Sequence, residues 1–194
     1  MKRFFAALCL MAALAFPSMA ATSRWTIDSA HSTAQFLVIH LEVSDVEGTF
    51  TKVTGSATID DDDLSKSRVS ASIDVSTVDT GIGMRDDDLK SADFFNVVSY
   101  PTMTFQSTKI WKTGDGDAKM TGNLTLHGVT KEVTFDVKIP APPANQTPAR
   151  RTAEATATIS RRAFGVSGDS MMIGDDVSIT LEIQLVRTGN APGN

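Results

Sequence analysis

The clearest pattern along the chain is a two-residue alternation of apolar and polar side chains. Val133, Phe135 and Val137, for example, alternate with charged or hydroxyl neighbours. Successive side chains of a β-strand point to opposite faces, so this period predicts strands with one apolar face. The alternating runs span residues 69–76, 103–111, 120–126, 133–139 and 177–185. Residues 35–43 are apolar on both parities, which predicts a strand covered on both sides for part of its length.

Turn residues separate these runs. Gly114-Asp115-Gly116 and Gly128 predict tight hairpins, and residues 140–148, with four prolines, predict a loop. Only residues 84–96 resist assignment as strand, and their Met, Arg, Leu, Lys and Ala content predicts a short helical insert. The chain is therefore expected to be all-β, with eight or nine antiparallel strands. Closing such a sheet into a barrel pairs every strand edge, so a barrel is the favoured architecture.

The interior of an eight-stranded barrel is either filled by side chains or just wide enough for one small ligand. Ala153, Ala155 and Ala157 share a parity, opposite Glu154 and Thr156. If these alanines point inward, they contribute little volume. Small residues can interdigitate with large ones in a packed core, or they can form the floor of a cavity. Residue type alone leaves both readings open.

The first residues predict an export signal rather than part of the fold. Lys2 and Arg3 precede an apolar run, and small residues end at Ala20, so residues 1–20 are expected to be a cleaved secretory leader. Residues 21–194 are then expected to form one exported domain, with secretion left open. That domain has 16 basic and 23 acidic residues, a net charge of −7. Such an acidic chain is a poor partner for nucleic acid, and no later segment is apolar enough to insert stably in a membrane. A homodimer is left open as the assembly state.

The search for catalytic or metal chemistry gives little. The runs Asp60–Asp63 and Asp86–Asp88 lack the glycine and the distal glutamate of a calcium loop, and the second run suits the start of a helix. The histidines His31, His40 and His127 form no zinc-binding pattern. We therefore expect no enzyme activity, no cofactor and no metal site, and an apolar ligand becomes the natural occupant of the barrel.

Several ordered motifs resemble those of one known family. They are WTIDSAHSTAQFLVIHL from Trp25, VEGTF from Val46, IDVSTVDTG from Ile73, RDDDLKSADFF from Arg85, YPTMTFQSTKI from Tyr100, GNLTLHGVTKEVTFDV from Gly122 and ISRRAFGV from Ile159. Together they resemble the YceI-like family of periplasmic polyisoprenoid-binding proteins. The resemblance implies a lipocalin-like antiparallel barrel that holds a long isoprenoid or similar amphiphilic chain without catalysis. Two positions depart from the family pattern, since Asp88 stands where a His is usual and Ser160 where an Asn is usual.

Parity and the resemblance together predict the site. The cavity is expected to be lined by Phe36, Val38, Ile73, Val75, Met103, Phe105, Leu124, Leu126, Phe135 and Val137. The candidates for contacting a polar head group are His31, Arg85 and Arg161, while Phe94 and Phe95 are expected to pack the helical insert onto the barrel. Each lining residue can equally be ordinary core.

The predicted function is binding, transport or storage of a polyisoprenoid, an isoprenoid quinone or a similar amphiphile. Two alternatives remain. One is an exported structural or stress-response interaction module whose barrel is solid. The other is a metal-dependent enzyme that uses Asp86–Asp88 with a histidine.

Overall fold

A computed structural model describes residues 22–40, 44–140, 149–168 and 172–190. The predicted leader, residues 1–20, lies outside these ranges, as does most of the predicted loop 140–148. The strands are β1 (Ser23–Ile27), β2 (Thr33–His40), β3 (Ser44–Phe50), β4 (Val53–Ile59), β5 (Arg68–Asp74), β6 (Val78–Asp79), β7 (Thr102–Lys112), β8 (Asp117–Leu126), β9 (Val129–Lys138), β10 (Arg150–Ser160) and β11 (Ile173–Asn190). The helices are α1 (Gly83–Lys90) and the 3-10 turns η1 (Ser29–His31), η2 (Leu64–Lys66), η3 (Val75–Thr77) and η4 (Arg162–Phe164).

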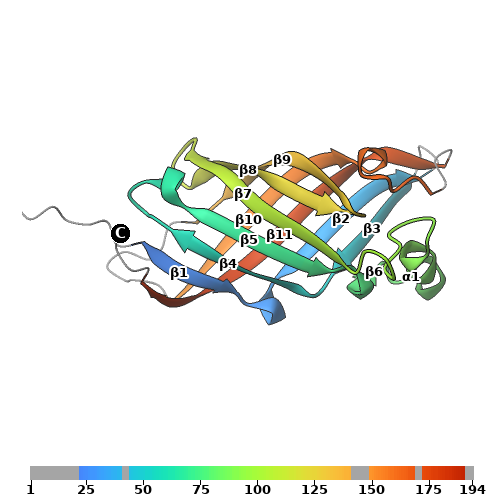
Figure 1. Cartoon of the computed structure of the whole chain (residues 1–194), viewed down its shortest axis with the longest axis horizontal. Helices are drawn as coiled ribbons and strands as arrows, with labels where there is room; N and C mark the ends of the chain where they lie inside the picture. The colour runs from blue at the N-terminus through green and yellow to red at the C-terminus, as the bar shows by residue number, and fades with distance from the viewer. Residues whose placement is uncertain (1–21, 41–43, 141–148, 169–171, 191–194) are drawn as a thin grey trace, which may run out of the picture.

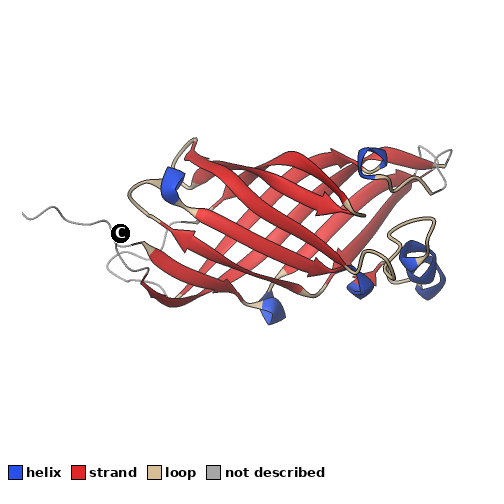
Figure 2. Cartoon of the chain, viewed as in Figure 1, coloured by secondary structure: helices blue, strands red, loops and turns tan. Residues whose placement is uncertain are grey.

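The strands close into an antiparallel barrel (Figures 1 and 2). Eight of them form the ring β1-β4-β5-β7-β8-β9-β10-β11, and the pairing of β1 with β11 closes it. The predicted eight-stranded barrel with one short helical insert is thus confirmed. Strands β1 and β2 pair with successive parts of the long strand β11, so together they occupy one place in the ring. The turn η1 separates them. Strands β3 and β4 likewise share the next place, because β4 pairs with β1 and β3 pairs with β2. Strands β5 and β6 share the place after that, because β5 pairs with β4 and β6 pairs with β3.

The alternation in the sequence matches the two faces of the wall. Along β9, Val133, Phe135 and Val137 are buried while the residues between them are exposed. The two-residue turn before β9 is built by His127 and Gly128, which both have positive φ, at 51° and 74°. Two such residues give the tight turn whose twist matches that of the flanking strands. This is the hairpin predicted at Gly128.

The chain between β6 and β7, residues 80–101, is here called the insert. It contains α1 and lies at the end of the barrel where β6 stops (Figure 1). The helix ends at Lys90, earlier than the predicted 96, and a series of turns follows it. No helix in the described part of the chain is long and apolar enough to cross a membrane.

The opposite end of the barrel carries a buried aromatic ring and an ion pair. Trp25 is 1% exposed, and the Arg151 guanidinium lies 4.8 Å from the centroid of its ring. Both terminal nitrogens of Arg151 donate to the Asp61 carboxylate, at 2.6 and 2.8 Å. A bidentate pair of this kind fixes geometry as well as charge, so Arg151 holds the chain after β4 over Trp25.

Candidate functional site

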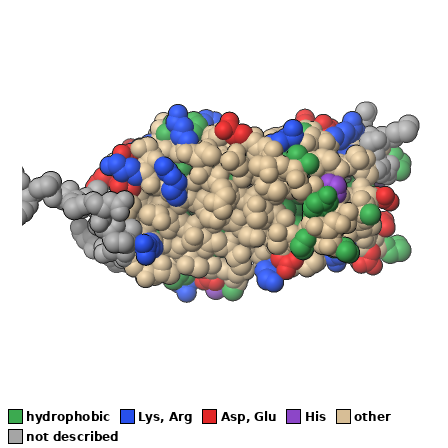
Figure 3. Space-filling view, viewed as in Figure 1, with side chains coloured by type: hydrophobic (Ala, Val, Ile, Leu, Met, Phe, Trp, Pro, Cys, Tyr) green, Lys and Arg blue, Asp and Glu red, His purple; other side chains and the backbone are tan. Residues whose placement is uncertain are grey.

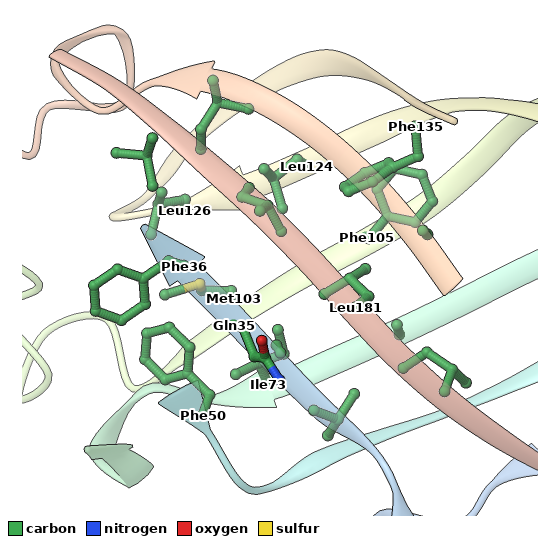
Figure 4. A pocket seen from close by; sticks show the side chains of 18 of the residues that line it. Gln35, Phe36, Phe50, Ile73, Met103, Phe105, Leu124, Leu126, Phe135 and Leu181 are labelled. Atoms are coloured by element: carbon green, nitrogen blue, oxygen red, sulfur yellow. The ribbon is translucent and has the colours of Figure 1, made fainter. Parts of the chain in front are cut away.

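The barrel encloses a cavity of about 690 Å³. Its lining includes apolar side chains from all eight strands of the ring, and Figure 4 shows Phe36, Phe50, Met103 and Phe105 among them. The lining reaches the surface at the insert, where Met84 is 81% exposed. The end of the barrel that carries the insert is therefore called the mouth.

The structure places most of the predicted lining residues around this cavity. They are Phe36, Val38, Ile73, Met103, Phe105, Leu124, Leu126, Phe135 and Val137. Phe105 and Phe135 meet edge to face with ring centroids 5.3 Å apart. A row along β11 also lines the cavity: Val177, Ile179, Leu181, Ile183 and Leu185. The alternation of residues 177–185 was the signal for this row, although none of its members was named as a site residue.

Val75 does not lie where parity predicted. It is 1% exposed and packs in the barrel core at the start of η3. Strand β5 ends one residue earlier, because the Asp74 carboxylate accepts hydrogen bonds from the backbone N–H and the hydroxyl of Ser76, at 3.1 and 2.6 Å. This cap starts a 3-10 turn, so the two-residue period stops at Asp74. Val75 therefore packs in the core and does not line the cavity.

Two of the alanines of β10 line the cavity instead of interdigitating in a solid core. Ala153 and Ala155 line the cavity, opposite Ile183 and Leu181 on the neighbouring strand. Ala157 packs against the core on the same face. The small alanine side chains leave space that larger side chains would fill, so β10 helps to keep the interior hollow.

Aromatic rings link the insert to the barrel at the mouth. The centroids of Phe36 and Phe50 are 5.7 Å apart, and those of Phe50 and Phe95 are 5.6 Å apart with an edge-on geometry. Phe94 lies against Gly168, where an added Cβ would come within 3.0 Å of the ring. Phe94 and Phe95 both pack against the core and line the cavity.

Arg161 is a buried cation in the cavity wall, with 6% of its surface exposed. Its Nε donates to the carbonyl of Gly174 at 2.8 Å, and its Nη2 donates to that of Ile173 at 2.8 Å. Its Nη1 donates to the carbonyls of Val166 and Gly168, at 3.0 and 2.9 Å. Arg161 therefore ties the described parts of the chain between β10 and β11 together at the mouth. Its positive charge lies beside the cavity.

Arg85 also lines the cavity, where it clamps the start of the insert. Its Nε donates to the Thr80 hydroxyl at 2.8 Å and its Nη2 to the Thr80 carbonyl at 2.9 Å. The same hydroxyl and the Thr80 N–H donate to Asp86, at 2.6 and 2.8 Å. These bonds, the one from the hydroxyl foremost, hold the pKa of Asp86 below its usual value. The Asp86 carboxylate thus binds Thr80 at the start of the insert and does not accept from the first N–H groups of α1.

His31 lies away from the cavity. It is in η1, its side chain is 64% exposed, and its Nδ1 is 3.0 Å from an Asp28 carboxylate oxygen. Arg150 donates to the same oxygen at 2.6 Å and is the main reason that the pKa of Asp28 is lowered. The predicted head-group role of His31 does not fit this position, because η1 interrupts the wall between β1 and β2 instead of facing the interior.

The remaining polar candidates are spread over the mouth. Asp88 is exposed and borders the cavity. His40, at the end of β2, is half-buried and also borders the cavity. His127 instead stacks on Tyr100, with centroids 4.6 Å apart. Among the residues that the structure describes, no three His, Cys, Asp or Glu side chains are grouped to hold a metal ion.

Comparisons with known proteins agree on one family. A family model described as the YceI-like domain matches residues 25–185. A UPF0312 protein of Pseudomonas aeruginosa (strain LESB58) is 35% identical over 190 residues, covering 96% of this chain and 99% of the relative. The crystal structure of Burkholderia cenocepacia BcnA is 27% identical, covers 81% of this chain and 98% of its own, and has a TM-score of 0.74.

A more distant structure shares the fold alone. It is described as a polyisoprenoid binding domain from Saccharophagus degradans implicated in plant cell wall breakdown, and it is 14% identical with a TM-score of 0.66. The alignment covers 84% of this chain and 98% of that one. With a family model that spans nearly the whole barrel and a relative of the same length, this chain belongs to the YceI-like family.

Proposed function

We propose that this protein binds a long apolar chain, such as a polyisoprenoid, an isoprenoid quinone or a similar amphiphile, inside the barrel. It acts without catalysis, as a carrier or store in the periplasm. The observation that carries the proposal is the cavity of about 690 Å³ lined by apolar side chains from every strand of the ring. That volume lies within the usual range for small-molecule sites. Such a cavity argues against the solid-barrel alternative.

The length of the cavity suits an extended chain. Its lining runs along β11 from Val177 to Leu185. Eight residue steps of about 3.3 Å, on a strand tilted by roughly 40°, give about 20 Å along the barrel axis. About twenty buried methylene-sized groups would contribute roughly 16 kcal/mol, at ~0.8 kcal/mol each. This gross gain exceeds the roughly 4–15 kcal/mol that association costs, so the chain alone can drive binding.

The polar end of the ligand is assigned to the mouth. Arg85, Arg161, Asp88 and His40 border the cavity there, whereas the buried Trp25 ring and the Arg151–Asp61 pair lie at the other end. A head group placed at the mouth keeps its contact with water and with these charges. Burying it beneath Trp25 would cost its hydration. The Saccharophagus neighbour is described as binding polyisoprenoids, and this is the chemistry that the cavity favours here.

Solvent extraction of the purified protein followed by mass spectrometry tests the proposal directly. A paired variant makes the test specific. Leu124 faces the cavity and Asn123 faces outward on the same strand. Leu124→Trp should fill the cavity and lower the bound ligand severalfold with little loss of stability, while Asn123→Trp should leave the ligand in place. A Leu124→Trp protein that loses about 1–3 kcal/mol of stability by overpacking, with no ligand in either form, would refute the proposal.

A further inference from the structure

The large hydrophobic side chains that remain exposed are gathered at the mouth. Among the described residues they are Ile39, Ile82, Met84, Val98 and Met172. Val98 and Met84 protrude most, at 93% and 81% exposed. Ile82, Met84 and Val98 belong to the insert, while Ile39 and Met172 lie at the end of β2 and just before β11. Figure 3 shows hydrophobic side chains on the surface at this end. This set is called the rim.

The rim is continuous with the cavity. Ile82 and Met84 are exposed and also line the cavity. On the other side, Ile39 lies on the outer face of β2, because its neighbours Val38 and His40 both line the cavity. An apolar chain that leaves the cavity therefore meets Ile82 and Met84, while the other rim side chains flank the opening on the outer surface. Isolated exposed hydrophobic residues need no explanation, but a group of them around one opening does.

The spacing of the rim favours a lipid surface over a folded protein. Its members come from three parts of the chain, the insert, the end of β2 and the start of β11, and lie among charged residues such as Asp87 and Asp88. A stable protein interface needs about 800 Å² of matched surface on each partner. A lipid layer is fluid, and separate apolar side chains can each sink into it.

The charge around the rim indicates which lipids suit it. Helix α1 carries three carboxylates next to Met84, Asp86 to Asp88, against two cations, Lys90 and Arg85, and Arg85 is already bonded to Thr80. Anionic head groups would be repelled by these carboxylates, over a Debye length of about 10 Å at 0.1 M salt. We infer that the rim docks the mouth onto a neutral, zwitterionic lipid surface, so that the apolar chain passes between lipid and cavity without crossing water. This inference rests on the proposed function, since it supplies the route by which the cavity is loaded.

The test uses rim positions that do not line the cavity. Ile39→Thr with Val98→Thr removes two apolar groups on different segments, both exposed. We expect at least a roughly tenfold weaker partition into phosphatidylcholine vesicles in a flotation assay, because each side chain loses its apolar burial. A second variant adds Thr113→Val, directly after β7, and Thr152→Ile, next to Arg151 in β10; both positions are exposed and lie outside the rim. It should bind vesicles as weakly as the first variant.

A second measurement separates docking from ligand binding. Fluorescent geranylgeraniol offered in detergent should be taken up equally by the wild-type protein and both variants. If the wild-type protein takes up this probe but ignores the vesicles, the lipid surface is wrong and a protein is the remaining partner for the rim. Vesicle binding that is unchanged in the first variant, or restored in the second, would also overturn the inference, as would stronger binding when anionic phosphatidylglycerol is added at low salt. Failure of every protein to take up the probe would instead count against the proposed function.

Discussion

Phe95 is the residue whose removal best tests how the insert is held on the barrel. Its ring meets Phe50 edge-on at 5.6 Å, and Phe50 in turn contacts Phe36 of β2. Its backbone N–H donates to the carbonyl of Leu89 at 2.9 Å. Phe95→Ala keeps that hydrogen bond and removes only the ring, so the change isolates the side-chain packing.

The expected loss follows from burial. Truncating a fully buried Phe to Ala costs about 3–5 kcal/mol. Phe95 is only half-buried, so a loss of about 2–4 kcal/mol is expected, including the edge-on pair at ~0.5–1.5 kcal/mol. For a domain of this size each kcal/mol lowers the melting temperature by about 2–4 °C. Phe95→Ala should therefore melt roughly 5–15 °C lower.

Urea denaturation measures the loss, with Val98→Thr as the control. Val98 lies in the same insert and is almost fully exposed, so its change should stay within about 0.5 kcal/mol. The dissociation rate of a bound apolar chain gives a second readout, and Phe95→Ala should raise it because the ring forms part of the cavity wall. A loss below about 1 kcal/mol with an unchanged slope against urea would show that the insert is not anchored through this ring.

Three further substitutions test the polar contacts at the mouth. Asp86→Asn should speed hydrogen exchange at the Thr80 amide, whereas Asp87→Asn, at an exposed carboxylate, should not. Because the folded pKa of Asp86 is lowered, chiefly by the Thr80 hydroxyl, its stabilisation is present above the unfolded value of about 3.9. It is lost as the pH falls through the folded pKa, and exchange measured from neutral to acidic pH should show this. Arg161→Lys should lower the stability by about 2–4 kcal/mol in thermal denaturation, since a single ammonium cannot replace four bonds to carbonyl oxygens.

Alternation predicted the barrel wall well because each strand has one dry face. Met103 and Phe105 on β7, like Leu124 and Leu126 on β8, line the cavity as their parity required. The period of two leaves no freedom here, since a slip by one residue would turn these side chains to the solvent. Whether the interior is hollow lay beyond this pattern. It depends on the summed volume of facing side chains, to which Ala153 and Ala155 contribute little.

The two predicted site residues that the structure places outside the cavity lining, Val75 and His31, lie where local hydrogen bonds interrupt a strand. At Val75 the Asp74 cap ends β5, and at His31 a 3-10 turn separates β1 from β2. The apolar and polar residues keep alternating through Val75, so nothing in the sequence pattern shows that the strand ends at Asp74. Arg161 is a different case. Its position beside the cavity agrees with the prediction, but the four carbonyl groups around it come from residues that the fold brings together and that no spacing reveals.

The two ends of the barrel differ in how they can open, and this difference gives the proposed ligand a direction. Opening the far end requires breaking the bidentate Arg151–Asp61 pair and exposing Trp25 to water. Opening the mouth requires the insert to move, which gives up the contact of Phe95 with Phe50 but exposes no fully buried residue of α1. Segments with few buried contacts open at lower free energy than the strands they cover. An apolar chain should therefore enter tail first through the mouth. Once bound, its tail points toward the end of the barrel that holds Trp25, and its head group stays at the mouth beside Arg85 and Arg161.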